Sequence, residues 1–298
     1  MDRQSILTNS VIVAAHPDDE LLWFTSILRE VDQVIMVFED FAPHPHLGEA
    51  RRRVIVDYPR AGVTSLAIEE SGALGCADWS APEPGAFGLK LGYEEKRRAI
   101  TNFARSSYSV LRLDGGGRRA LPRIERAYAT NYGRIYAALK ERLKPDMNVF
   151  THNPWGEYGH EEHVQLFRVV DRLRSEIGFK LWMSNYCTNR SLPLATRYFP
   201  ASSAPYLRLP ADKDFANQVA DVYKKHGCWT WSDDWTWFED ECFMEAPDGA
   251  RAPVSGGHLF PLNIFTIDVP RQSRMLAATA TVAASAATVA LAMTAMAD

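Results

Sequence analysis

The segment from residue 11 to residue 38 constrains the fold more than any other. Residues 11–15 form a continuous apolar run rich in β-branched side chains, which is typical of a buried strand. Apolar residues then recur at helical spacing over residues 20–31, and a second apolar run at residues 34–38 predicts another strand. This succession predicts a right-handed strand–helix–strand unit with parallel strands.

The same alternation continues along the chain. Further helices are expected over residues 49–61, 121–143 and 160–174, and further strands over residues 65–68, 146–151 and 179–184. Residues 75–120 are rich in turn-forming residues and are expected to be irregular. The predicted fold class is therefore α/β, with a Rossmann-like open, mostly parallel sheet and helices on both faces.

Three parts are expected along the chain. Residues 1–190 form the core, and residues 191–272 form a C-terminal α+β elaboration of the same domain that shapes the substrate pocket. The elaboration is predicted to contain a helix over residues 211–227, a Trp-rich strand or loop over residues 229–238, and a strand over residues 259–269. Residues 273–298 form an Ala-rich, helix-prone tail.

Composition excludes several classes of function. The formal net charge of −4 and the lack of a basic block argue against a nucleic-acid partner. Four widely spaced cysteines predict reduced thiols, and the N-terminus lacks the apolar core of a secretory signal, so a cytoplasmic location is expected. Residues 275–297 carry no charge and are long enough to cross a bilayer. They are mostly Ala and Thr, so a surface appendage is favoured and a membrane anchor is the alternative.

A cluster of polar residues, HPDDE, directly follows the first predicted strand. In open α/β sheets, ligands bind at the carboxyl ends of the strands, which is where His16, Asp18 and Asp19 would lie. Capping of the next helix explains one aspartate but not the whole cluster. Imidazole and carboxylate groups are ordinary zinc ligands, and a catalytic zinc keeps three protein ligands and a water.

A third ligand is expected from another strand end. Residues 151–167 follow the fourth predicted core strand and contain His160 and His163, which are three residues apart and share a face if a helix begins there. The spacing is not that of the HEXXH metalloprotease motif. His152 ends the same strand and is expected to line the pocket.

The two segments AHPDDE and GHEEH together resemble the LmbE-like, or PIG-L, family of metal-dependent N-deacetylases. The resemblance covers roughly residues 9–190 and implies a Rossmann-like fold. It further implies one zinc ion per chain, or another divalent metal, and removal of an acetyl group from an N-acetylglucosamine-type sugar amide. The expected partner is a small N-acetylated sugar or glycoconjugate, with no membrane contact except through the tail.

The resemblance also implies residue roles. His16, Asp19 and His163 bind the metal, Asp18 is the general base, and His160 stabilises the oxyanion with a contribution from Tyr158. The family usually has GHPDH where this chain has GHEEH. Glu161 thus replaces a proline, and Glu162 replaces an aspartate that orients the oxyanion histidine.

The substrate side is predicted from residue type. Arg52 lies where relatives place a substrate-contacting arginine, although a solvated helix face explains it equally well. His152, Trp155 and Trp231 complete the predicted substrate-binding set, while a core position is the ordinary alternative for each Trp. Two other functions remain open at this point. One is an amidase of the same family that acts on a thiol-sugar conjugate, and the other is a non-catalytic sugar-binding relative.

Overall fold

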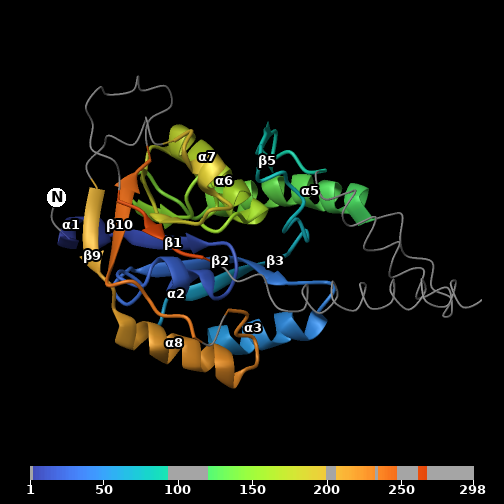
Figure 1. Cartoon of the computed structure of the whole chain (residues 1–298). Helices are drawn as coiled ribbons and strands as arrows, with labels where there is room; N and C mark the ends of the chain where they lie inside the picture. The colour runs from blue at the N-terminus through green and yellow to red at the C-terminus, as the bar shows by residue number, and fades with distance from the viewer. Residues whose placement is uncertain (1–2, 93–119, 199–205, 232–233, 247–260, 267–298) are drawn as a thin grey trace, which may run out of the picture. The chain divides into compact units, whose positions relative to one another are not determined.

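A seven-stranded sheet forms the centre of the computed structural model, with the strand order β3-β2-β1-β6-β7-β10-β9 (Figure 1). The structure describes residues 3–92, 120–198, 206–231, 234–246 and 261–266. The strands from β3 to β7 in this order are parallel, and β10 is antiparallel to both of its neighbours. Their bounds are β1 (Ser10–Ala14), β2 (Gln33–Asp40), β3 (Val63–Glu69), β6 (Asn148–Thr151), β7 (Lys180–Met183), β9 (Tyr206–Pro210) and β10 (Asp240–Glu245). The predicted α/β class with a mostly parallel sheet is confirmed.

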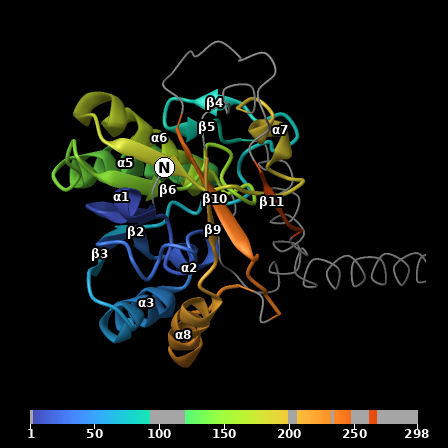
Figure 2. The same ribbon diagram turned by 90° about the vertical axis from the view of Figure 1, so that its left-hand side faces the viewer.

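Helices cover both faces of this sheet (Figures 1 and 2). α5 (Ala120–Lys140) and α6 (Glu161–Ile177) pack on one face, and α2 (Asp19–Trp23), α3 (Pro45–Asp57) and α8 (Lys213–Lys225) lie on the other. The shorter elements are α1 (Arg3–Leu7), α7 (Leu192–Ala195), β4 (Pro84–Gly85), β5 (Gly88–Leu89), β8 (Tyr186–Cys187) and β11 (Asn263–Ile264).

Alternate residues of β1 feed the two cores. Val11 and Val13 belong to the apolar core under α5 and α6, whereas Ile12 and Ala14 belong to the core under α3 and α8. Successive side chains of a strand point to opposite faces, so a strand covered on both sides needs an unbroken apolar run. This requirement explains why the segment before HPDDE is continuously hydrophobic.

The helix that follows HPDDE is shorter than the sequence predicts. The apolar spacing indicates a helix over residues 20–31, but α2 ends at Trp23. The buried Glu241 of β10 accepts hydrogen bonds from the backbone N–H groups of Thr25 (3.1 Å) and Ser26 (2.7 Å). The N–H groups of Thr25 and Ser26 are therefore hydrogen-bonded without being part of a helix. The carboxylate of Glu241 thus ends α2, although the spacing of apolar residues would continue the helix.

Glu241→Ala is expected to lower the free energy of unfolding by roughly 2–4 kcal/mol. The change leaves two buried N–H groups without their acceptor and also removes the partner of the Tyr186 hydroxyl (2.8 Å). Urea denaturation measures the loss. Glu239→Ala is the matched control, because the Glu239 side chain is 87% exposed and forms a surface ion pair with Lys213, and it should change stability little. Equal stability of the two variants would contradict this account of the end of α2.

The C-terminal elaboration extends the central sheet. α8 matches the expected helix, and β10 with β9 adds an antiparallel edge that the sequence reading did not anticipate. Within the predicted strand at residues 259–269, the structure describes only the short β11, which pairs with β8. Residues 229–231 and 234–238 form no strand. The Ala-rich tail at residues 273–298 lies outside the described residues. Among the helices that the structure does describe, none is long and apolar enough to cross a membrane.

Candidate metal centre

The two polar motifs meet at the carboxyl edge of the sheet. His16, Asp18 and Asp19 follow β1, and His160 and His163 lie at the start of α6, which follows the neighbouring strand β6. All five side chains are buried. The turn between β6 and α6 requires positive φ at Gly156 (65°) and Gly159 (88°), conformations that glycine adopts without strain.

Ring nitrogens and a carboxylate converge in this cluster. His16 Nδ1 and His163 Nε2 each lie 3.1 Å from the same oxygen, Oδ2 of Asp19. One ligand atom from each of His16, His160 and His163 lies within 4.8 Å of the other two, and the same holds for Asp19, His152 and His163. The structure therefore contains a buried His/Asp cluster with the donor atoms to hold a metal ion.

His163 fits a ligand role especially well. Its Nδ1 is hydrogen-bonded to Glu157 Oε2 at 2.7 Å, the carboxylate–histidine pairing that fixes the ring of a metal ligand. Its Nε2 is buried and lies 3.1 Å from Asp19 Oδ2, but it makes no hydrogen bond among the described residues. A buried ring nitrogen without a hydrogen bond is costly, and a metal ion at this position would remove the cost.

His152 makes hydrogen bonds to the backbone after β1 and to Glu157, next to the cluster. Its Nε2 accepts the backbone N–H of Ala15 at 2.8 Å, so the lone pair of that nitrogen is already used. Its Nδ1 is hydrogen-bonded to Glu157 at 2.9 Å. Burial lowers the pKa of His152, which agrees with a neutral ring. His152 is fully buried, so it braces the site and does not line an open pocket.

Glu157 is hydrogen-bonded to both His152 and His163, and no role was predicted for it from the sequence. Burial raises the pKa of its carboxyl, but His152 and His163 outweigh that effect and bring the pKa to about 2. Its second oxygen accepts the Asn153 N–H and the Ser184 hydroxyl, so the carboxylate is fully satisfied. Glu157 lies in WGEYGH between two glycines, and its spacing alone gives no signal that it would turn inward.

The side chain of Asp18 does not cap the helix that follows it, α2. It precedes α2 at φ 110°, a left-handed conformation that is strained for a non-glycine residue, and its side chain caps no N–H of the helix. Its carboxylate instead accepts the hydroxyl of Thr230, and its N–H donates to Glu20 Oε2 at 3.0 Å. Burial, followed by the charge of Asp19, raises the pKa of Asp18 to about 7. The capping interpretation therefore does not account for Asp18.

Glu20 stabilises the strained backbone conformation of Asp18 through hydrogen bonds to both of its own carboxylate oxygens. Its Oε1 accepts hydrogen bonds from the hydroxyls of Tyr58 (2.9 Å) and Tyr223 (2.8 Å), which belong to the α3 and α8 side of the core. The loop that carries Asp18 is thus tied to residues far away in the sequence. Thr230 and Tyr223 come from the C-terminal elaboration, so that part of the chain helps to build the site.

His160 presents one defined ring nitrogen to the cluster. It is the N-cap of α6, and its Nδ1 accepts the N–H of Glu162 at 3.2 Å. In the neutral ring the proton must then sit on Nε2, which leaves Nε2–H as a donor. Burial, followed by the charge of His163, holds the pKa of His160 well below its ordinary value. The ring of Tyr158 stands edge-on to His160 with a centroid distance of 5.6 Å.

The predicted substrate-binding residues fall in different places. Trp231 packs against Tyr158 with ring centroids 5.3 Å apart, next to the histidines. Trp155 is fully buried in the core and donates to the Tyr186 carbonyl. Arg52 is half-exposed and pairs with Glu39 and Asp40, so nothing in its contacts directs it to the site. The buried neighbour Arg51 contacts Glu70 at 2.6 Å, and its charge acts on Asp18.

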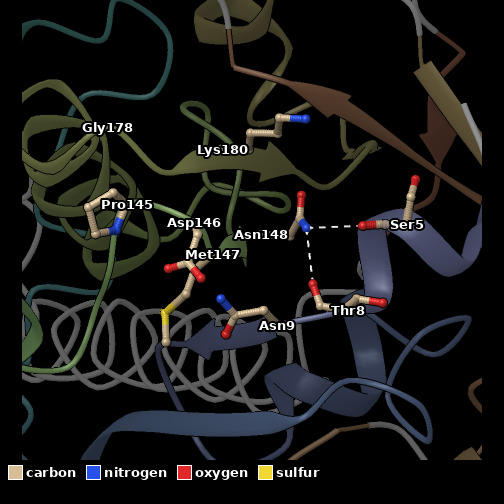
Figure 3. A pocket seen from close by; sticks show the side chains of 9 residues that line it. All are labelled: Ser5, Thr8, Asn9, Pro145, Asp146, Met147, Asn148, Gly178 and Lys180. Atoms are coloured by element: carbon tan, nitrogen blue, oxygen red, sulfur yellow. Dashed lines mark hydrogen bonds between the residues drawn. The ribbon is translucent and has the colours of Figure 1, made fainter.

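A separate hollow lies at the opposite edge of the sheet. Its volume is about 400 Å³, and its lining comes from the N-terminal ends of β1, β6 and β7 (Figure 3). The Asn148 amide donates there to the carbonyl groups of Ser5 and Thr8. None of the cluster residues lines this hollow, so it is distinct from the candidate metal centre.

Comparisons with known proteins add no assignment. No family model matches the chain, and a search of curated proteins also gives no match. The resemblance to the LmbE-like family therefore rests on the two sequence motifs alone.

Proposed function

We propose that this chain is a zinc-dependent hydrolase that removes the acetyl group from an N-acetylglucosamine-type sugar amide. The observation that carries the proposal is the convergence of the HPDDE and GHEEH segments into one buried cluster, in which Nε2 of His163 lies 3.1 Å from Asp19 and makes no hydrogen bond among the described residues. Both segments resemble motifs of the N-deacetylases, and each supplies residues that the proposed chemistry needs.

Three residues would hold the metal: His16 through Nδ1, Asp19 through its carboxylate, and His163 through Nε2. Nδ1 of His16 and Nε2 of His163 each lie 3.1 Å from Oδ2 of Asp19. The second ring nitrogen of each histidine is hydrogen-bonded to a glutamate carboxylate. When bound, such a metal polarises an amide carbonyl and lowers the pKa of water. Three protein ligands leave a position open for the reaction, as in other catalytic zinc sites.

Asp18 and His160 would carry the proton and charge transfers. A general base works best when its pKa is near the operating pH, and the pKa of Asp18 is about 7. Asp18 would accept the proton of the attacking water. When the C–N bond breaks, the leaving amine would receive a proton from Asp18 or from Nε2 of His160. The Nε2–H of His160 would donate to the oxyanion that forms at the acetamide carbon, the interaction that usually contributes most in acyl transfer.

Aromatic rings beside the cluster suit a sugar ring. Trp231 lies against Tyr158, Trp23 and Trp235, with centroid distances of 5.3, 5.5 and 5.5 Å. Trp231 and Trp235 are partly exposed, unlike Trp23. Flat aromatic faces pack on the apolar face of a pyranose, while indole N–H groups remain available for hydroxyls. The Nε1 of Trp235 is buried without a hydrogen-bond partner among the described residues.

The test is acetate release from a panel of N-acetylglucosamine glycosides by the zinc-loaded chain. We expect stoichiometric acetate, loss of activity on chelation, and recovery when zinc is restored. Cleavage of a thiol-sugar conjugate at a different amide, without acetate, would favour the related amidase. Sugar binding without hydrolysis of any amide, with zinc bound, would contradict an enzymatic role.

A further inference from the structure

Two adjacent carboxylates, Glu161 and Glu162, begin α6 and are both buried. They stand where the resembling family has proline and aspartate. Both reach the same loop after β3, but they make different contacts. Glu161 accepts the N–H groups of Gly75 (3.0 Å) and Ala77 (2.8 Å) together with Nε1 of Trp79 (3.0 Å). The described contacts of Glu161 are therefore with this loop and not with the histidines.

Glu162 connects the loop to the cluster. Its Oε1 accepts both the N–H and the hydroxyl of Ser71, at 2.7 and 2.6 Å. Its Oε2 lies 3.0 Å from Nε2 of His16. No hydrogen bond between this carboxylate and His160 occurs among the described residues. The residue expected to orient His160 therefore contacts His16 on the other side of the site.

We propose that Glu162 is a positioning residue that keeps the proton of His16 on Nε2 and so leaves Nδ1 free to bind the metal. The inference rests on the proposed metal centre. It identifies a determinant of metal affinity that is not itself a ligand.

The hydrogen-bond inventory supports this assignment. The two donors of Ser71 occupy Oε1, so Oε2 is the atom that faces His16. An ionised carboxylate only accepts hydrogen bonds, so the proton between Glu162 and His16 belongs to Nε2 of the ring. The opposite nitrogen, Nδ1, is hydrogen-bonded to Asp19 Oδ2 at 3.1 Å, and the proton in this second contact is the one that a metal ion would displace.

Packing limits the other ring orientation. The imidazole of His16 is stacked on Phe38 with a centroid distance of 5.3 Å and an interplanar angle of 24°. The His16 N–H also donates to Asp19 Oδ2 at 2.7 Å, which ties the backbone to the same carboxylate. A half turn of the ring would place ring carbons where the two nitrogens now lie and would break both carboxylate contacts. Glu162 and Asp19 thus define the ring from opposite edges.

Glu162→Gln tests the proposal with a change of a single atom type. If the new amide oxygen keeps the two Ser71 donors, its NH₂ group faces His16 and donates to Nε2. The ring proton must then move to Nδ1, the nitrogen that the metal needs. We expect zinc affinity, measured by competition with a chromophoric chelator, to fall about 10–100-fold, as for other outer contacts of metal ligands.

Glu161→Gln is the matched control, because it changes the neighbouring buried carboxylate and the same loop without touching His16. We expect both variants to lower the melting temperature and only Glu162→Gln to weaken zinc binding. If Glu162→Gln does not fold, Glu162→Asp decides, since the shorter carboxylate cannot reach Ser71 and His16 together and should also weaken zinc binding.

The outcomes separate this inference from the proposed function. Equal zinc affinity of wild type and a folded Glu162 variant would overturn the positioning role and leave the metal centre intact. An equal loss of affinity in Glu161→Gln would also overturn it, because the effect would then come from the loop. A wild-type chain that binds no zinc would overturn both proposals.

Discussion

Asp18→Asn is expected to keep one zinc ion per chain and to slow acetate release by about 10²–10⁴-fold, the contribution typical of a positioned general base. The amide has almost the shape of the carboxyl group and can still accept the Thr230 hydroxyl, so the local structure should persist. It cannot accept the proton of the attacking water. The fold and the metal ligands are unchanged, so the loss should appear in kcat and not in zinc content.

Thr230→Val is the control for the Asp18 variant. It removes the hydroxyl that contacts Asp18 and leaves the carboxylate in place, so it should reduce the rate far less than Asp18→Asn. Steady-state kinetics and zinc analysis of the same preparations measure both effects. Full activity of a zinc-containing Asp18→Asn chain would refute the assignment of Asp18 as the base.

His163→Ala is expected to abolish tight zinc binding, with a loss greater than the 10–100-fold that removal of an outer contact costs. The change removes a buried ring nitrogen that makes no hydrogen bond within the part of the chain that the structure describes, and it leaves Glu157 with one histidine partner fewer. Activity on any amide substrate should disappear together with the metal.

His44→Ala is the matched histidine control, because His44 is exposed at the start of α3 and belongs to none of the groups of possible metal ligands among the described residues. Isothermal titration with zinc measures both variants against wild type, and circular dichroism confirms that they fold. Unchanged zinc affinity in a folded His163→Ala chain would show that this nitrogen is not a ligand.

Local sequence patterns predicted most of the parallel core. The apolar runs at β1 and β2 and the helical spacing at α3, α5, α6 and α8 are local signals, so their positions could be predicted within a few residues. The end of α2 could not, because it depends on Glu241, which comes from β10 more than 200 residues later. The antiparallel β9–β10 edge was missed for a related reason. The pairing that stabilises its two strands is not local.

The candidate site divides in the same way. His16, Asp18, Asp19, His160 and His163 could be predicted because motif position and fold class together place them at one sheet edge. Glu157 and Glu162 act through a second contact on a histidine ring, and nothing in their spacing reveals which ring they reach. For Trp155 and Arg52 the substrate-binding role stays a prediction. Their residue types suit a sugar site, but their contacts place them in the core and in a surface ion pair.

Anomalous diffraction at the zinc edge from crystals of the zinc-loaded chain tests the central claim most directly. We expect one strong anomalous peak that marks a zinc ion bound by Nδ1 of His16, the carboxylate of Asp19 and Nε2 of His163. Asp18 and His160 should lie beside this ion without binding it. The ligand atoms of His16, Glu70 and Glu162 also lie within 4.8 Å of one another. A peak held by these three residues, a peak held by His152, or no peak in this cluster would contradict the proposed metal centre.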